Sequence, residues 1–147
     1  MEVLVLRLLS AGVLGHRWVR GRLPTDGSPD ERAVELVGCC SGLCHSTSWR
    51  QDRPGLLVLT YAAVPDPCPH EAAAPLLLPL VVTGGGALHP RPVEVAAGHV
   101  AAHAVRHLAD LAQRDPVGRE VARADACLWR AVAEAAGAAQ HRLDQAS

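Results

Sequence analysis

LCHSTSWRQDRPGLLVLTYAAV, residues 43 to 64, is the clearest secondary-structure pattern in the chain. Two runs typical of β-strands, Leu43–Arg50 and Leu56–Val64, flank a segment that contains Pro54 and Gly55. Such runs on either side of a short turn-forming segment predict an antiparallel hairpin with a four- or five-residue loop. The second run is apolar on both of its faces, which is typical of a central strand.

Strict alternation along the first strand predicts which of its side chains share a face of the sheet. If Arg50 pairs with Gly55, then Ser46 and Ser48 lie on the same side as Arg50. Two hydroxyl groups beside a guanidinium can bind an anion or a carboxylate, because the guanidinium offers a planar fork of donors. The candidate ligand-binding residues are Ser46, Ser48, Arg50, Tyr61 and His45.

Two other interpretations of this strand compete with ligand binding. The first is an ordinary edge strand that is polar on its solvent side and packs Trp49 in the core. The second is a serine–histidine nucleophile pair, which the pattern disfavours. Ser46 and His45 face opposite ways, and no carboxylate is placed to orient the imidazole.

The residues before the hairpin predict two more strands and a short helix. Glu2–Leu9 is rich in Val and Leu and indicates a buried strand, and Val13–Leu23 indicates a second strand. Asp30 is expected to cap a helix over Glu31–Val37, which Gly38 ends.

The residues after the hairpin change from strand to helix periodicity. Leu76–Val82 is predicted as a strand, at an edge or bent because it contains Pro79. Val93–Gln113 predicts a helix with one apolar side. Its opposite, solvated side carries His99, His103, Arg106 and Asp110.

A second C-terminal helix is predicted to begin at Asp115, where an N-cap residue is followed by Pro116. Gly137 is expected to end it, with a frayed tail from about residue 138. Strands followed by helices indicate an α+β fold. We therefore predict one domain over residues 1–147, with a small, mostly antiparallel sheet, a central hairpin and two covering C-terminal helices.

The composition argues against two classes of partner. The net charge is −1 and all 14 basic residues are scattered arginines, so we expect no nucleic-acid partner, which would need a clustered basic face. No run is long and apolar enough to span a membrane, and Met1–Leu14 is a poor signal peptide because Glu2 and Arg7 interrupt it. We expect a cytoplasmic protein with reduced cysteines.

Two groups of residues invite a metal-site interpretation. The first combines cysteines and histidines near the hairpin, namely Cys39, Cys40, Cys44, His45, Cys68 and His70. The second is the series His99, His103 and His107, which lacks the adjacent Glu of the zinc-protease helix motif. Neighbouring residues on a strand point to opposite faces, and cysteines are commonly buried for packing. We therefore predict no metal and no cofactor.

Two resemblances accompany these patterns. HSTSWR at residues 45–50, with LVLTY at 57–61 and VRHLA at 105–109, resembles a family of actinobacterial proteins of unknown activity, over roughly Leu43–Gln113. The order of strand, Leu-Pro loop, short helix and hairpin is similar to the Nudix hydrolases. If Gly27 begins their box, Ala33 stands where that family has a Glu. The Nudix resemblance then implies an inactive copy or a different site, since the magnesium-binding carboxylates are missing.

These observations predict a non-catalytic ligand-binding or regulatory module with an anion-binding strand face. The alternative is an enzyme, either a diverged Nudix-type hydrolase or another metal-dependent hydrolase, and the sequence leaves that question open. A small anionic ligand is the expected partner. A homodimer through the Ala-rich C-terminal helices is a further possibility.

Overall fold

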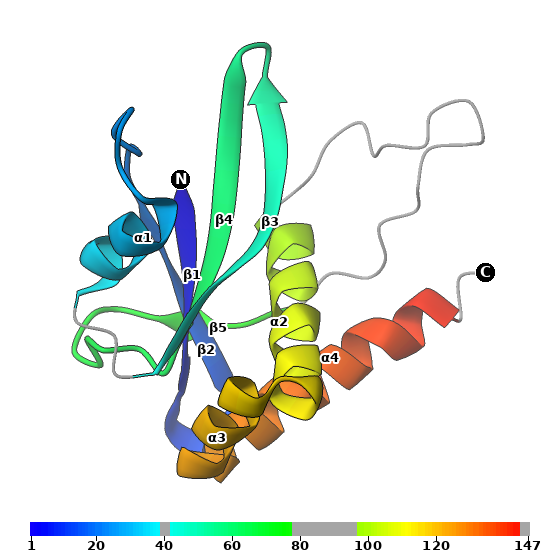
Figure 1. Ribbon diagram of the computed structural model, residues 1–147. Helices are drawn as coiled ribbons and strands as arrows, with labels where there is room; N and C mark the ends of the chain where they lie inside the picture. Colours follow the sequence, from blue (N-terminus) through cyan, green and yellow to red (C-terminus); the bar gives the residue numbers. More distant parts are fainter. Residues whose placement is uncertain (39–41, 78–96, 145–147) are drawn as a thin grey trace.

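Strand β1 (Glu2–Leu8) lies inside the sheet, and Val3 to Leu6 are fully buried. It pairs antiparallel with β2 (Leu14–Arg20) and parallel with β4 (Leu56–Val64). Strand β3 (Leu43–Arg53) pairs with β4, and β5 (Ala74–Pro75) pairs with β2, both antiparallel, which gives the order β3-β4-β1-β2-β5 (Figure 1). The computed structural model describes residues 1–38, 42–77 and 97–144.

Helices cover both faces of this sheet. Helix α1 (Pro29–Val37) packs on the face that carries Val3 and Val5. Helices α2 (Ala97–Arg114) and α4 (Ala126–Asp144), joined by α3 (Pro116–Ala124), pack on the face that carries Leu4 and Leu6. Alternate residues of one apolar strand thus supply two separate cores. The predicted α+β fold, with a mostly antiparallel sheet and C-terminal helices packed on it, is confirmed.

The predicted helix boundaries are partly confirmed. Asp115 caps α3 by accepting a hydrogen bond from the Gly118 nitrogen at 2.9 Å, and Gly38 ends α1 with a positive φ of 86°. The N-cap of α1 is Ser28 rather than the predicted Asp30, because Pro29 takes the first helical position. Gly137, which was expected to end the last helix, lies inside α4.

The second predicted C-terminal helix is two helices in the structure. A break falls at Asp125, whose carboxylate accepts a hydrogen bond from the Leu128 nitrogen at 3.1 Å and so starts α4. On the N-terminal side, β2 is shorter than the predicted Val13–Leu23. Of the predicted strand Leu76–Val82, the part from residue 78 lies outside the described residues, and the preceding Ala74–Pro75 forms β5.

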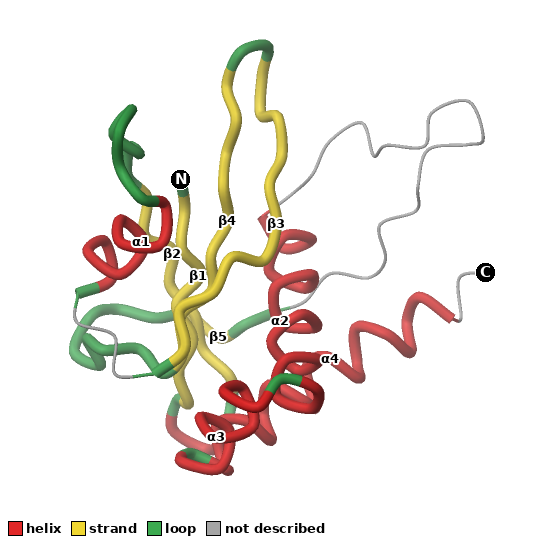
Figure 2. Tube along the Cα trace, viewed as in Figure 1, coloured by secondary structure: helices red, strands yellow, loops and turns green. Residues whose placement is uncertain are grey.

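The hairpin of β3 and β4 is confirmed, but the predicted register is wrong. Arg53 pairs with Leu56 across a two-residue turn, in which Gly55 has a φ of 80°. The register shifts twice, at Thr47 and at Asp52, because each of these residues is an extra residue in β3. The hairpin extends beyond the helices that cover the sheet (Figure 2).

A buried carboxylate ties the segment after β4 to the sheet. Asp66, whose side chain is 1% exposed, accepts hydrogen bonds from Arg17 at 2.9 and 2.7 Å and forms an ion pair with Arg7 at 3.5 Å. Arg7 also donates to the carbonyl oxygens of Pro69 and Glu71, each at 2.7 Å. Burial raises the pKa of Asp66, but the hydrogen bond from Arg17 and the charges of both arginines outweigh it and lower the pKa.

The Ala-rich helices supply much of the larger core. Ala101, Ala104 and Ala131 are buried between the helices and the sheet. A homodimer through these helices stays a prediction. Over the ranges that the structure describes, the helices contain no segment with the length and hydropathy that a membrane crossing requires.

Candidate functional site

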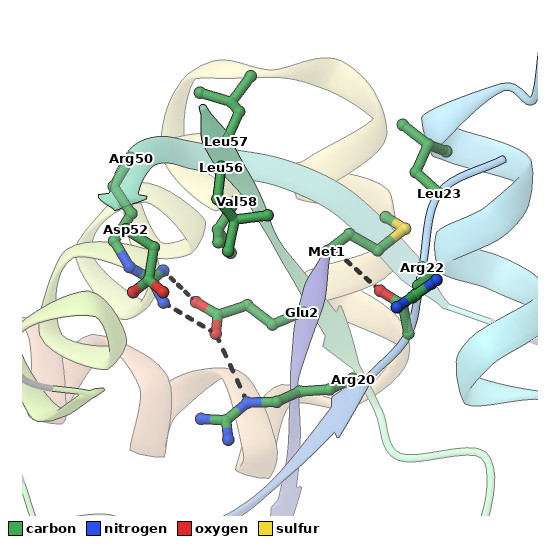
Figure 3. A pocket seen from close by; sticks show the side chains of 11 residues that line it. Met1, Glu2, Arg20, Arg22, Leu23, Arg50, Asp52, Leu56, Leu57 and Val58 are labelled. Atoms are coloured by element: carbon green, nitrogen blue, oxygen red, sulfur yellow. Dashed lines mark hydrogen bonds and ion pairs between the residues drawn. The ribbon is translucent and has the colours of Figure 1, made fainter. Parts of the chain in front are cut away.

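A cavity of about 640 Å³ opens where β1 begins and β2 ends, beside the hairpin (Figure 3). The nitrogen of Met1 donates a hydrogen bond to the Gly21 carbonyl at 2.8 Å, which holds the two strand ends together. The hairpin forms the opposite wall. The lining residues are Met1, Glu2, Arg20, Gly21, Arg22, Leu23, Arg50, Asp52, Leu56, Leu57 and Val58.

An ion pair between Glu2 and Arg50 forms the floor of this cavity. The Glu2 side chain is 5% exposed and that of Arg50 is 25% exposed. The two terminal nitrogens of Arg50 donate to the two carboxylate oxygens of Glu2, the second of them at 3.2 Å. Thr60 lies beside them, and its hydroxyl donates to Glu2 Oε1 at 2.9 Å. Three strands, β1, β3 and β4, thus meet at one carboxylate.

The electrostatics of the pair keep both groups charged. Burial acts to raise the pKa of Glu2, but the hydrogen bonds from Arg50 and Thr60 and the charges of Arg50 and Arg20 lower it overall. The hydrogen bond to Glu2 raises the pKa of Arg50. The charge of Arg50 is therefore largely neutralised inside the protein.

Two further arginines line the cavity with little internal neutralisation. Arg20 reaches Glu2 only through its Nε, at 3.8 Å, and its side chain is 69% exposed. Arg22 is exposed, and no carboxylate within the described part of the chain forms an ion pair with it. Counting Arg50, three arginines and two carboxylates (Glu2 and Asp52) line the cavity, so these side chains together carry one net positive charge.

The structure divides the residues predicted as one binding face. Because Thr47 is an extra residue, Ser46 pairs with Tyr61 and Ser48 pairs with Thr60, and Thr60 and Tyr61 point to opposite faces of the sheet. The prediction that Ser46 shares a face with Ser48 and Arg50 is therefore wrong.

Each part of the divided set has its own surroundings. Ser48 and Arg50 lie on the face that carries Thr60 and Glu2. Tyr61 is buried on the α1 side, where its hydroxyl donates to Asp30 Oδ1 at 2.5 Å. Burial and this hydrogen bond raise the pKa of Tyr61 to about 12, so the phenol stays protonated. Whether any of these residues binds a ligand stays a prediction.

The structure also places Trp49 and His45 differently from what the sequence predicted. Trp49, which one interpretation packed in the core, is 67% exposed on the extended part of the hairpin. His45 does not lie at the cavity. Its ring stacks on that of His107 in α2, with 5.3 Å between ring centroids. The predicted solvated face of α2 therefore lies partly against β3.

Four residues at the cavity were not predicted as site residues from the sequence, namely Glu2, Thr60, Arg20 and Arg22. One signal was present, because Glu2 alternates with Leu4 and Leu6 and so had to face the same core. A carboxylate at such a position needs a partner, since burying an unpaired charge is strongly unfavourable. Nothing local in the sequence shows that this partner is Arg50, 48 residues away.

The candidate metal ligands that fall within the described residues do not form a metal site. Among the residues that the structure describes, no group of three or more His, Cys, Asp or Glu side chains is arranged to hold a metal ion. Cys39 and Cys40 lie outside the described residues. Cys68 lies near the end of α1, where its Sγ is 3.7 Å from the Val37 carbonyl oxygen.

Comparisons with known proteins add no functional assignment. No protein-family model, curated protein or solved structure matches the chain. The resemblances to an actinobacterial family and to the Nudix hydrolases stay predictions. The features that bear on function are therefore the cavity and the groups that line it.

Proposed function

We propose that the protein is a non-catalytic binding module for a small anionic ligand, held in the cavity beside the hairpin. The observation that carries the proposal is the pair Arg20 and Arg22. Both line the cavity, and Glu2 leaves most of their positive charge without a partner. Guanidinium groups bind carboxylates and phosphates through paired hydrogen bonds. Arg50, a residue of the predicted strand face, forms part of the same cavity.

The apolar part of the lining narrows the ligand class. Met1, Leu23, Leu56 and Val58 contribute side chains to the cavity beside the arginines. Small-molecule sites commonly combine an apolar lining with a few polar groups that fix the ligand's orientation. We therefore expect a ligand that has one acidic group and an apolar portion, such as a medium-chain carboxylate, to bind better than a bare anion.

A thermal-shift series tests this proposal. Inorganic phosphate, nucleoside diphosphates and linear carboxylates from acetate to octanoate are added at matched ionic strength. A ligand present at about a hundred times its Kd should raise the Tm by roughly 5–10 °C, from the linkage relation and the usual size of Tm shifts in domains of this length. Among the carboxylates, octanoate should give a larger shift than acetate.

The variant Arg20→Gln/Arg22→Gln should lose this response, because it removes the two exposed charges and leaves the Glu2–Arg50 pair in place. Arg130→Gln is the matched control, since Arg130 is an exposed arginine on α4 that does not line the cavity. The control should respond as the wild type does. If no anion raises the Tm, or if the double variant responds equally, the proposed function is wrong.

A further inference from the structure

The contact between β3 and α2 involves histidines of both elements. His99, His103 and His107 recur at every fourth residue of α2 and so share one helical face. His107 stacks on His45 of β3, with ring planes 14° apart. The Nε2 of His103 lies 3.2 Å from the carbonyl oxygen of Thr47. We call these four residues the histidine seam.

The seam is buried in part, since the side chains of His45 and His103 are exposed and those of His99 and His107 are half-buried. The Nδ1 of His99 and the Nε2 of His107 are buried, and neither has a hydrogen-bond partner among the described residues. Burial lowers the pKa of His107, and the neighbouring His45 and His103 lower it further. Asp110, which lies about one turn further along α2, acts to raise the pKa of His107.

The other elements near the seam add few charges. β4, which pairs with β3, contains no Asp, Glu, Arg or His, and its one titratable group, Tyr61, is on the α1 side. On α4, which packs against α2, the described side chains of Cys127, Arg130 and Glu134 are exposed. Within the described part of the chain, the charged groups that α2 itself adds beside the four imidazoles are therefore Arg106 and Asp110.

We propose that the histidine seam is a proton-sensitive contact that holds α2 on β3 near neutral pH and loosens when the solution is acidified. The stacked imidazoles of His45 and His107 share a contact that is partly buried on the His107 side. When both rings are protonated, their like charges repel at this separation, and His107 also loses hydration. Because this contact lies outside the cavity, the proposal goes beyond the proposed ligand binding.

The direction of the pH effect follows from linkage. His107 has a lower pKa in the folded state than in the unfolded or opened state, so the opened state binds more protons between the two values. The contribution of the seam is complete above the ordinary histidine pKa of about 6.5, and it decreases as the pH falls below that value. Glu2 and Asp66, whose pKa values are lowered from those of ordinary carboxyl groups, titrate at lower pH.

A chain of hydrogen bonds connects the seam with the cavity. The Thr47 hydroxyl donates to the Thr60 carbonyl at 3.2 Å, and the Thr60 hydroxyl donates to Glu2. A displacement of Thr47 away from His103 therefore acts on the strand position that holds the Glu2–Arg50 pair. An effect of pH on anion binding would follow from this connection, and that consequence also rests on the proposed function. The opening of the seam itself does not rest on the proposed function.

Hydrogen exchange of the full chain, read by mass spectrometry at about pH 7.5 and about pH 5, tests the seam without any ligand. After correction for the intrinsic rates, peptides from α2 and from residues 43–48 should exchange faster at the lower pH, because protonation of His107 favours the opened state. In His45→Gln/His107→Gln this acceleration should be lost. His70→Gln, a change of an exposed histidine in a loop, should behave as the wild type.

Equal acceleration in the double variant and the wild type would overturn the proposal, as would its absence from the wild type. A titration of the wild-type imidazoles by NMR decides the matter if the double variant does not fold. In that titration His107 should protonate below the ordinary histidine range, and a value at or above that range would contradict the seam. Anion binding plays no part in either measurement, so failure here and failure of the proposed function are distinguishable.

Discussion

Replacing Asp66 with Asn is expected to lower the free energy of unfolding by about 3–5 kcal/mol, the range for a buried ion pair that loses one partner. The Asp66 carboxylate is almost completely buried and accepts two hydrogen bonds from Arg17. An amide of the same shape cannot neutralise Arg17 or Arg7, and its NH2 group would face an arginine donor. Urea unfolding at neutral pH measures the loss.

Asp110→Asn is the matched control for this experiment. Asp110 pairs with Arg114 across one turn of α2, and both side chains are largely exposed. The loss of such a pair should lower the free energy of unfolding by about 0.3–0.5 kcal/mol. Equal losses in the two variants would contradict the role given to Asp66.

The pH dependence offers a second check on Asp66. Its folded-state pKa is lowered, so its contribution is complete above the unfolded value of about 4 and is lost as the pH falls toward the folded value. Wild-type stability should therefore fall toward the Asp66→Asn level in strongly acidic solution. A difference between the two proteins that stays constant from neutral pH to about pH 2 would show that the carboxylate charge is not what stabilises this cluster.

The parts of the fold that follow from local patterns were predictable from the sequence. β4 is apolar on both faces and lies between two strands, as a central strand should. Asp115 with Pro116 starts a helix, and Gly38 ends one, because capping depends on a few neighbouring residues. The apolar side of α2 is buried, with Ala101, Ala104 and Leu108 in contact with the core.

The candidate site was less predictable because it depends on β-bulges. A bulge is set by how a strand fits its partner, and the residues of β3 alone do not show that Thr47 is unpaired. One extra residue moves every later side chain to the other face. The polar run of residues 45–50 therefore divides between the α1 side, which has Ser46, and the α2 side, which has His45, Ser48 and Arg50.

The cavity also depends on contacts between residues that are distant in the sequence. Glu2 and Arg50 come from different hairpins, and the parallel pairing of β1 with β4 brings them together. That pairing was not predicted, because a parallel partner is joined by a crossover and leaves no turn signal next to the strand. The solvated face assigned to α2 was wrong in part for a related reason, since the position of His103 on β3 is a tertiary contact.

Arg50→Gln should lower the free energy of unfolding by about 3–5 kcal/mol at neutral pH, because it leaves the Glu2 carboxylate buried without its main partner. Burial would then raise the pKa of Glu2, since the hydrogen bond from Thr60 and the exposed charge of Arg20 do not offset the loss of hydration. A folded-state pKa above the unfolded value reduces stability as the pH rises through it. The difference from wild type should therefore be smaller at about pH 5 than at about pH 7.5.

A double-mutant cycle with Glu2→Gln separates the ion pair from the packing of the two side chains. The double variant Glu2→Gln/Arg50→Gln buries no unpaired charge, and its two amides can hydrogen-bond to each other. It should therefore be more stable than Arg50→Gln alone, with a coupling free energy of about 1–3 kcal/mol between the two positions. Additive losses would mean that Arg50 acts through packing. In that case the internal neutralisation of Arg50, and with it the assignment of anion binding to Arg20 and Arg22, would have to be abandoned.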